Sequence, residues 1–388
     1  MVKALKEIFE QHFGRNGEVI HSFFAPGRVC LIGEHLDYNG GFVLPCALSM
    51  GTYLLVRKRK DHILKLTSLN YSSSFEISLN EIDAKVGNDW WNYPVGVVNE
   101  FQKIVSGALG FEMLFNGDLP ISAGLSSSAS IEVVTAFSLN ELLNTKLSLK
   151  EIALLSKRAE NDFVGVQCGI LDQYAVALGR KNHAMFLNCV TEEHEFIPVN
   201  IGDYEFIIAN TNKPRQLENS AFNDRFNECR GALQIMQRLL PVNFLADATL
   251  QQFDSIEHFF PDEVTRKRAH HIVYEQERVK RAASALARGD VGELAALMNQ
   301  SHASLRDYYD ASCSELETIV SAALSVNGCL ASRPSGAGFG GCTINLIRAE
   351  VKERFCEKVF SEYKMKTGLN AEFYEVKMED GVKKFHLQ

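Results

Sequence analysis

The chain has 388 residues, 46% hydrophobic and 23% charged, so it holds enough apolar material for two domains and does not read as a low-complexity, disordered chain. A net charge of −8 argues against a nucleic-acid partner, and the basic runs at 57–60 and 266–268 are interpreted as solvated faces. The N-terminus lacks a signal-peptide core and no apolar stretch reaches about 18 residues, so we expect a cytoplasmic protein without a membrane partner. The nine cysteines are scattered and form no C-x-x-C pair, so we expect neither a disulfide framework nor a zinc site.

Hydrophobic periodicity predicts mixed helices and strands in the first half of the chain. Helices are expected at 3–13, 91–109, 131–143 and 150–163, and strands at 20–25, 29–32, 52–56, 62–68, 111–115 and 183–188. The second half is richer in helices, at 221–239, 262–288, 291–307, 314–326 and 349–364, with strands at 204–209, 343–347 and 371–377. The pattern predicts an α+β fold class in both halves, with a boundary near residues 203 and 204.

A serine-rich turn lies between the strand expected at 111–115 and the helix expected at 131–143. Small residues let backbone N–H groups approach an anion, and a helix N-terminus adds a positive dipole end. A helix cap explains one serine, but three in a row behind a glycine exceed that need. We therefore predict a phosphate loop that is not of the Walker type. Its residues are Gly124, Leu125, Ser126, Ser127, Ser128, Ala129 and Ser130.

A second glycine-rich segment, 336–341, matches the spacing G-x-G-x-x-G through Gly336, Gly338 and Gly341. A dinucleotide-binding turn of that spacing is followed by a helix, whereas the run after Cys342 reads as a strand. The sequence therefore excludes a Rossmann turn. The glycines fit either a tight turn with several positive φ angles or a close approach of the backbone to a ligand.

Polar residues are also packed between the two apolar strands expected near the N-terminus. Glu34, His35 and Asp37 lie within four positions, with Arg28 just upstream. Closely spaced carboxylates and an imidazole suit hydrogen bonding to a polyol. A metal site and a polar hairpin held by its own side chains are the alternatives, since H-x-D is a weak metal signal.

Together these segments resemble the galactokinase family, a sugar-kinase branch of the GHMP kinases. The segments 27–41, 124–130 and 336–342 look like three family motifs, and 166–173 resembles the segment that carries the catalytic aspartate. All four occur in the family order and cover nearly the whole chain. The resemblance implies an N-terminal domain of ribosomal-protein-S5-like fold (1–203), a ferredoxin-like C-terminal domain (204–388) and an active site in the cleft between them.

The resemblance also implies roles for single residues. Asp172 would accept or polarise the proton of a sugar's anomeric hydroxyl, with Arg28 beside it, while ATP donates its γ-phosphate. Ser128 and Glu160 match the Mg²⁺ ligands, and Trp90 matches a residue near adenine. The positions that match sugar contacts are Glu34, His35, Asp37, Gly169, Asp172 and Phe222. We expect small-molecule sugar and ATP as partners, and a monomer or weak homo-oligomer.

Three positions depart from the commoner galactokinase pattern: Leu36 replaces Thr, Phe222 replaces a sugar-contacting Tyr, and Pro334–Ser335 replaces Met-Thr. Loss of the Tyr hydroxyl removes one possible hydrogen bond, worth about 0.5–1.5 kcal/mol. N-acetylgalactosamine kinases resemble this chain at the first two positions. Galactose is therefore the expected substrate, with the acetamido sugar or a related hexose second. A non-catalytic galactose and ATP sensor is a further alternative, but such sensors look damaged in the phosphate loop, which is kept here.

Overall fold

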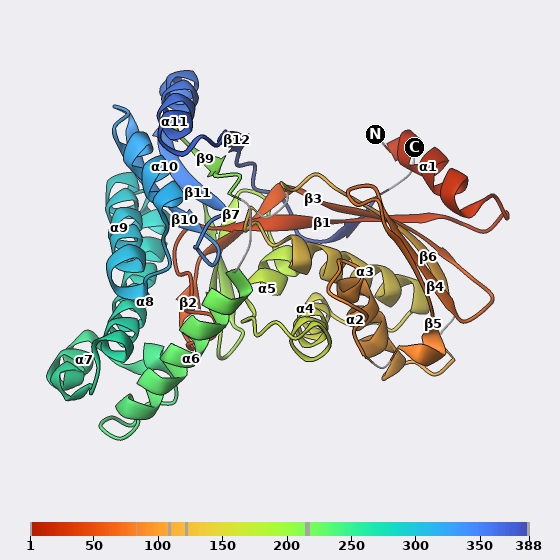
Figure 1. Ribbon diagram of the computed structural model, residues 1–388, viewed down its shortest axis with the longest axis horizontal. Coiled ribbons are helices and arrows are strands. Elements are labelled where there is room, and N and C mark those ends of the chain that lie inside the picture. Colours follow the sequence, from red (N-terminus) through yellow and green to blue (C-terminus); the bar gives the residue numbers. More distant parts are fainter. Residues whose placement is uncertain (1, 83, 108–109, 121–122, 214–217, 386–388) are drawn as a thin grey trace.

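The computed structural model describes residues 2–82, 84–107, 110–120, 123–213 and 218–385, which form a mixed α and β molecule (Figure 1). In the first half the helices are α1 (Val2–Phe13), α2 (Asn92–Gln102), α3 (Ser127–Leu143), α4 (Leu149–Arg158) and α5 (Leu171–Leu178), with a π-helical turn, η2 (Ala159–Val164). The strands there are β1 (His21–Cys30), β2 (Phe42–Val43), β3 (Pro45–Lys58), β4 (Ile63–Ser68), β5 (Ser74–Ser78), β6 (Phe111–Gly117), β7 (His183–Asn188) and β8 (His194–Pro198).

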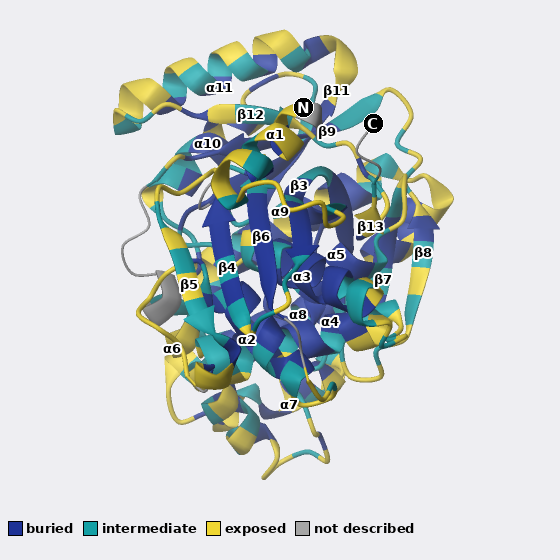
Figure 2. Ribbon diagram, turned by 90° about the vertical axis from the view of Figure 1, so that its right-hand side faces the viewer, coloured by how far each residue is buried: buried dark blue, intermediate teal, exposed yellow. Residues whose placement is uncertain are grey.

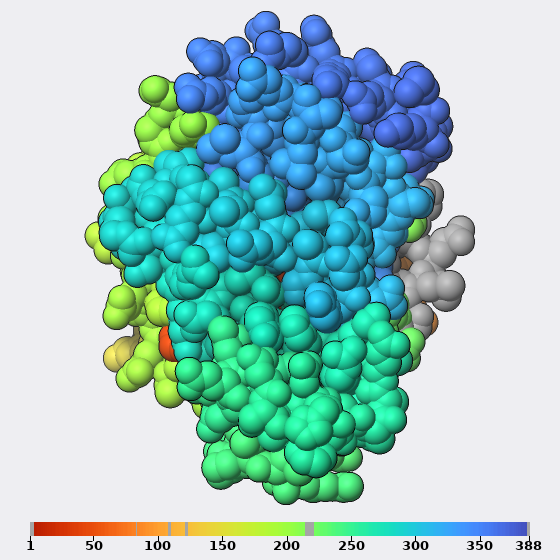
Figure 3. Space-filling view, turned by 90° about the vertical axis from the view of Figure 1, so that its left-hand side faces the viewer, coloured from red at the N-terminus to blue at the C-terminus, as the bar shows by residue number. Residues whose placement is uncertain are grey.

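The second half begins with β9 (Tyr204–Asn210) and is dominated by helices. These are α6 (Glu218–Met236), α7 (Leu250–Ile256), α8 (Glu263–Arg288), α9 (Val291–Ser304), α10 (Ser314–Leu324) and α11 (Lys352–Thr367), with a second π-helical turn, η5 (Leu305–Tyr309). The remaining strands are β10 (Cys329–Ser335), β11 (Cys342–Arg348), β12 (Glu372–Glu375) and β13 (Lys383–Lys384). This half covers most of the face shown in Figure 3, in green to blue.

A six-stranded sheet, in the order β13-β1-β3-β6-β4-β5, forms the frame of the first half. Alternate residues of its strands face opposite sides. Leu54 of β3 packs into the main core, whereas Leu55 packs with Leu5 and Phe9 of α1 on the other side. Helices α2 to α5 lie below the sheet in Figure 1, and the central strands are dark blue in Figure 2, so the centre of the sheet is buried on both faces.

A four-stranded antiparallel sheet, in the order β10-β11-β9-β12, organises the second half. Alternate residues of β9 face opposite sides of this sheet: Ile208 faces the main core, whereas Ile207 packs with Ile319 of α10 and Phe355 of α11. Two helix layers therefore enclose this sheet. A small third sheet, β2-β7-β8, lies beside the long strands.

The end of the chain returns to the first sheet. Lys383 and Lys384 of β13 pair with Phe24 and Phe23 of β1, and residue 378 forms a bridge to residue 48. The boundary at 203/204 stays a prediction, and these pairings show that the last described residues pack with the N-terminal sheet. The expected α+β class is confirmed.

Several expected elements differ from the observed ones. Strands at 20–25 and 29–32 are one strand, β1, which passes through Pro26 and Gly27 with a register shift there, a place where a sheet tolerates proline. The helix expected to 109 ends at Gln102, and 108–109 lie outside the described residues. The sequence did not predict the short helices α5 and α7 or the strand β10, because elements this short contain too few residues to show a clear hydrophobic period.

Candidate active site

A cavity of about 820 Å³ gathers the predicted site residues from both halves of the chain. Its lining includes Arg28, Glu34, His35, Asp37, Trp90, Gly124, Leu125, Ser126, Ser127, Ser128, Glu160, Gly169, Asp172 and Phe222. Of the predicted set, Ala129 and Ser130 do not line it. The Ser130 hydroxyl instead donates to the carbonyl of Ala25 (2.8 Å) and lies 2.9 Å from the Thr52 hydroxyl, so it ties α3 to the sheet.

Arg28 and Asp172 form an ion pair at the floor of the cavity. Arg28 Nε donates to Asp172 Oδ1 at 2.7 Å, and its Nη1 donates to the carbonyl of Gly124 at 2.6 Å. The Arg28 side chain is 7% exposed, whereas that of Asp172 is 29% exposed. Asp172 also lies in the first turn of α5, where the helix dipole favours a negative charge. The pair therefore presents an oriented carboxylate beside the phosphate loop.

The phosphate loop is shaped to leave donors unused. Helix α3 begins at Ser127, and the preceding Ser126 has a left-handed φ of 62° and makes no side-chain capping bond. Among the described residues, the buried hydroxyl of Ser126 has no hydrogen-bond partner. The alternative of a serine N-cap is thus not seen, and the first N–H groups of α3 are available to an anion. Residues 121 and 122, just upstream, lie outside the described residues.

The second glycine segment forms the turn between β10 and β11 and packs on the phosphate loop. Gly336 has φ 91°, and a Cβ there would lie 2.8 Å from the carbonyl oxygen of Gly124. A Cβ at Gly341 would lie 2.9 Å from the carbonyl oxygen of Ala123. The tight turn with positive φ angles is confirmed. The close approach seen is to another loop of the protein, and the approach to a ligand stays a prediction.

Glu160 and Ser128 lie together in the lining of the cavity. The Ser128 side chain hydrogen-bonds to the Glu160 carboxylate, and burial, reinforced by Asp172, raises the pKa of Glu160 to about 7. Glu132 is buried beside Glu160, and burial, reinforced by Glu160, raises its pKa well above the usual range, so this third carboxyl is held neutral. Carboxylate and hydroxyl oxygens are the kind of ligand that Mg²⁺ prefers. Within the described residues no group of three or more His, Cys, Asp or Glu side chains is arranged to hold a metal ion by itself.

Glu34 and His35 have their polar atoms engaged within the protein. Glu34 forms a buried ion pair with Arg333 and accepts the N–H of Gly336 (3.2 Å). His35, with φ 65°, is bonded through its two ring nitrogens to Tyr38 Oη (2.8 Å) and the carbonyl of Ala337 (3.0 Å). Burial lowers the pKa of His35 to about 3, so its ring is neutral. Contacts within the protein thus occupy most of the polar atoms of these two residues, although both line the cavity.

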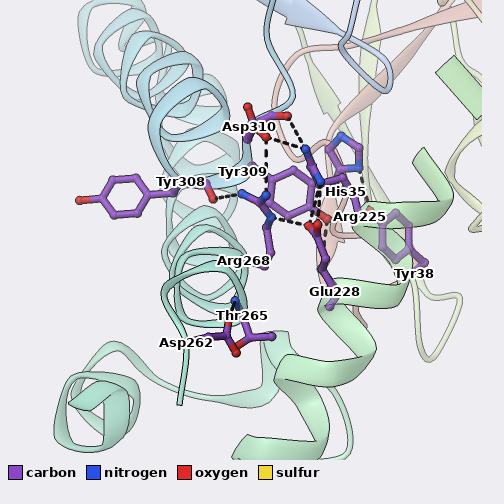
Figure 4. A network of polar contacts seen from close by, with 11 residues as sticks. His35, Tyr38, Arg225, Glu228, Asp262, Thr265, Arg268, Tyr308, Tyr309 and Asp310 are labelled. Carbon is purple, nitrogen blue, oxygen red and sulfur yellow. Dashed lines mark hydrogen bonds and ion pairs between the residues drawn. The ribbon is translucent and has the colours of Figure 1, made fainter. Parts of the chain in front are cut away.

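A network shown in Figure 4 extends from His35 to the helices of the second half. Tyr38 Oη lies 2.7 Å from Tyr309 Oη. Arg225 of α6 binds Glu228 and Asp310, and Arg268 of α8 binds Glu228 and the carbonyl of Tyr308. The network fixes α6, which places the Phe222 ring 5.9 Å from the His35 ring and 5.5 Å from the Tyr38 ring, between centroids.

Asp37 differs from its neighbours because its carboxylate meets Gly169. A Cβ at Gly169 would lie 2.0 Å from Asp37 Oδ2, which explains why glycine stands there. Burial, reinforced by Asp172, raises the pKa of Asp37 to about 6.

Trp90 lines another part of the cavity, and its ring is nearly parallel to that of Tyr71, with centroids 6.3 Å apart. Tyr71 also lines the cavity but was not singled out from the sequence.

Family comparisons agree with this geometry. A model of the GHMP kinase N-terminal domain matches residues 92–180, and a model of the GHMP kinase C-terminal domain matches 282–364. A mevalonate kinase crystal structure has the same fold, with a TM-score of 0.67 at 18% identity over 93% of this chain and 99% of the other. Fold and site thus define a kinase of the GHMP class.

The sequence comparisons are more specific. A galactokinase galactose-binding signature matches residues 7–58. Galactokinases of Bacillus subtilis and Clostridium beijerinckii are each 42% identical to this chain, over 99% of both chains. A crystal structure of Lactococcus lactis galactokinase complexed with galactose matches with a TM-score of 0.96 and 40% identity, over 99% of this chain and 100% of that one. The chain belongs to the galactokinase family.

Proposed function

We propose that the protein transfers the γ-phosphate of ATP to the anomeric (C1) hydroxyl of α-D-galactose, giving galactose 1-phosphate for galactose catabolism. The observation that carries the proposal is the Arg28–Asp172 pair, which touches the phosphate loop through the carbonyl of Gly124 inside one cavity. A sugar hydroxyl beside Asp172 then lies close to a phosphate held at the start of α3. Phosphoryl transfer needs mainly such positioning and charge stabilisation.

Each part of the mechanism has a residue to perform it. The unused N–H groups of α3 and the free hydroxyl of Ser126 bind the ATP phosphates. Asp172 accepts or polarises the hydroxyl proton, and Arg28 holds that carboxylate and stabilises the transferring phosphoryl group. Ser128 and Glu160 would hold Mg²⁺, which would supply positive charge to neutralise the ATP phosphates. Asp37 and the backbone at Gly169 orient the sugar.

A coupled ADP-release assay tests the proposal. Galactose, N-acetylgalactosamine, glucose and talose are compared with MgATP, and we expect turnover with galactose to exceed that with the other three sugars. MgATP and galactose should each raise the melting temperature. Tight binding of both without ADP release would instead identify a sensor. We propose a cytoplasmic monomer or weak homo-oligomer, and none of the described helices has the length and apolarity needed to cross a membrane.

N-acetylgalactosamine is the second candidate substrate, because Phe222 lacks the hydroxyl of the usual tyrosine while lining the cavity beside His35. We expect Phe222→Tyr to raise the kcat/KM ratio of galactose over N-acetylgalactosamine about two- to tenfold, the value of one neutral hydrogen bond. The ratio is measured by initial rates on both sugars. An unchanged ratio would exclude position 222 from sugar selection.

Galactose binding should weaken in mild acid. A raised native pKa means that ionised Asp37 is disfavoured, so the acceptor form is lost as the pH falls through about 6. At pH 5 about one tenth of Asp37 is ionised, and we expect the dissociation constant for galactose to be about tenfold higher than at pH 7. His35 stays neutral over this range because its pKa is about 3.

Galactose binding is measured without ATP, by calorimetry or thermal shift, at pH values from 7.5 to 5. Asp37→Asn is the control: it should bind weakly and lose most of the pH dependence. Wild-type binding that is constant over the range would show that the ionisation of Asp37 does not govern sugar affinity.

A further inference from the structure

Gln173 follows Asp172 on α5 and faces away from the cavity into a buried polar cluster. Its side chain is fully buried. The amide nitrogen Nε2 donates to Glu160 Oε2 at 2.7 Å and to Glu132 Oε2 at 3.2 Å. These acceptors lie on η2 and α3, so one amide group joins three elements that carry predicted catalytic, metal-binding and phosphate-binding residues.

The bonds to Glu160 fix how its carboxylate is turned. Oε2 accepts the Gln173 amide, and the Cys168 sulfur lies 3.3 Å from the same oxygen, although it is closer to Asn161 Oδ1, at 3.0 Å. Among the described residues neither side chain bonds to Oε1, and Ser128 also interacts with this carboxylate. A buried carboxylate held by an amide through one oxygen loses its freedom to rotate, and its other oxygen is left for a different partner.

The amide is the kind of group that this place requires. Glu132 and Glu160 are buried, and no ion pair to either is found among the described residues. An arginine or lysine at 173 would hold both carboxyl groups but would also neutralise the negative charge with which Glu160 attracts a cation. A neutral amide offers two N–H donors and leaves the charge of Glu160 in place.

We propose that Gln173 is a positioning residue that holds Glu160 in the orientation in which it meets the Mg²⁺ of MgATP, and so couples this ligand to the helical turn that carries Asp172. The inference rests on the proposed kinase function. Partners that orient a metal ligand typically contribute about 10- to 100-fold to metal affinity.

The test follows the Mg²⁺ dependence of ATP binding without turnover. Melting temperature is measured with ATP and no sugar while Mg²⁺ is titrated, for the unaltered chain and for Gln173→Met, which keeps the side-chain length but removes both donors. We expect the half-saturating Mg²⁺ concentration to rise about tenfold or more. Galactose-induced stabilisation should be unchanged, and turnover lost at low Mg²⁺ should recover at high Mg²⁺.

Two further variants make the result decisive. Gln276→Met is the matched control, because Gln276 is a buried glutamine of α8 whose Oε1 accepts the Phe42 N–H outside the phosphate and metal region. Its Mg²⁺ dependence should stay at the wild-type value. Gln173→Asn keeps an amide on a side chain one methylene shorter, which cannot reach both carboxyl groups, and it decides the question alone if Gln173→Met does not fold.

Three outcomes are distinguishable. A half-saturating Mg²⁺ concentration within twofold of wild type in a folded Gln173 variant overturns this proposal and leaves the kinase function standing. An equal rise in Gln276→Met also overturns it, since the effect would then be general destabilisation. A wild-type chain that shows no galactose turnover at any Mg²⁺ concentration would instead remove the proposed function.

Discussion

Asp172→Asn should lower kcat about 10²- to 10⁴-fold while galactose and MgATP still bind. The asparagine side chain has nearly the same shape and retains an oxygen that can accept the Arg28 guanidinium, 2.7 Å away in the native pair. It cannot accept a proton, and it removes the negative charge that faces the cavity. General-base assistance of this kind contributes about 10²- to 10⁴-fold to rate.

The measurement pairs steady-state kinetics with binding. Galactose and MgATP affinities from calorimetry should stay within about threefold of wild type, because the loss lies in the transition state. Asp254→Asn on α7, where Asp254 accepts the Tyr274 hydroxyl outside the cavity, is the control and should keep wild-type turnover. Turnover near wild type in Asp172→Asn would remove Asp172 from the reaction.

The motifs in the sequence located the site, because each motif is a short local segment whose residue types follow from its chemistry. Helix starts, glycine turns and short polar runs each keep a recognisable pattern, and most of the predicted residues line one cavity. Arg28 and Asp172 meet although they are 144 positions apart. Their meeting was expected only from the resemblance, because spacing alone does not say which strand end faces which helix.

What the sequence missed is mostly buried pairing between distant segments. Arg333 stands in a strand that was not predicted, and nothing local indicates that it reaches Glu34, 299 positions away. Gln173 was not singled out from the sequence, since its carboxylate partners come from other elements. Helix α5 also starts without a side-chain cap, so Asp172 could not be placed on a helix turn. Such contacts are set by tertiary packing, which periodicity does not report.

Arg333→Met should lower the free energy of unfolding by about 3–5 kcal/mol, since removing one partner of a buried ion pair leaves the other charge uncompensated. Arg333 is fully buried, pairs with Glu34, and donates Nη1 to the carbonyls of Cys30 (3.3 Å) and Leu31 (3.1 Å). These bonds join β10 to the loop that follows β1. Urea denaturation and melting temperature measure the loss, and the KM for galactose should rise because this loop carries Asp37.

A double variant separates the unpaired charge from the lost packing. If the isolated Glu34 carboxylate causes most of the damage, Glu34→Gln combined with Arg333→Met should be more stable than Arg333→Met alone, because no buried charge is then left without a partner. Glu34→Gln alone leaves Arg333 unpaired but still bonded to two carbonyl groups, so its cost should be smaller than that of Arg333→Met. The double variant could instead be less stable than either single variant. In that case Arg333 does not stabilise the fold by compensating the Glu34 charge, and its bonds to the carbonyls of Cys30 and Leu31 are what stabilise the contact between β10 and the end of β1.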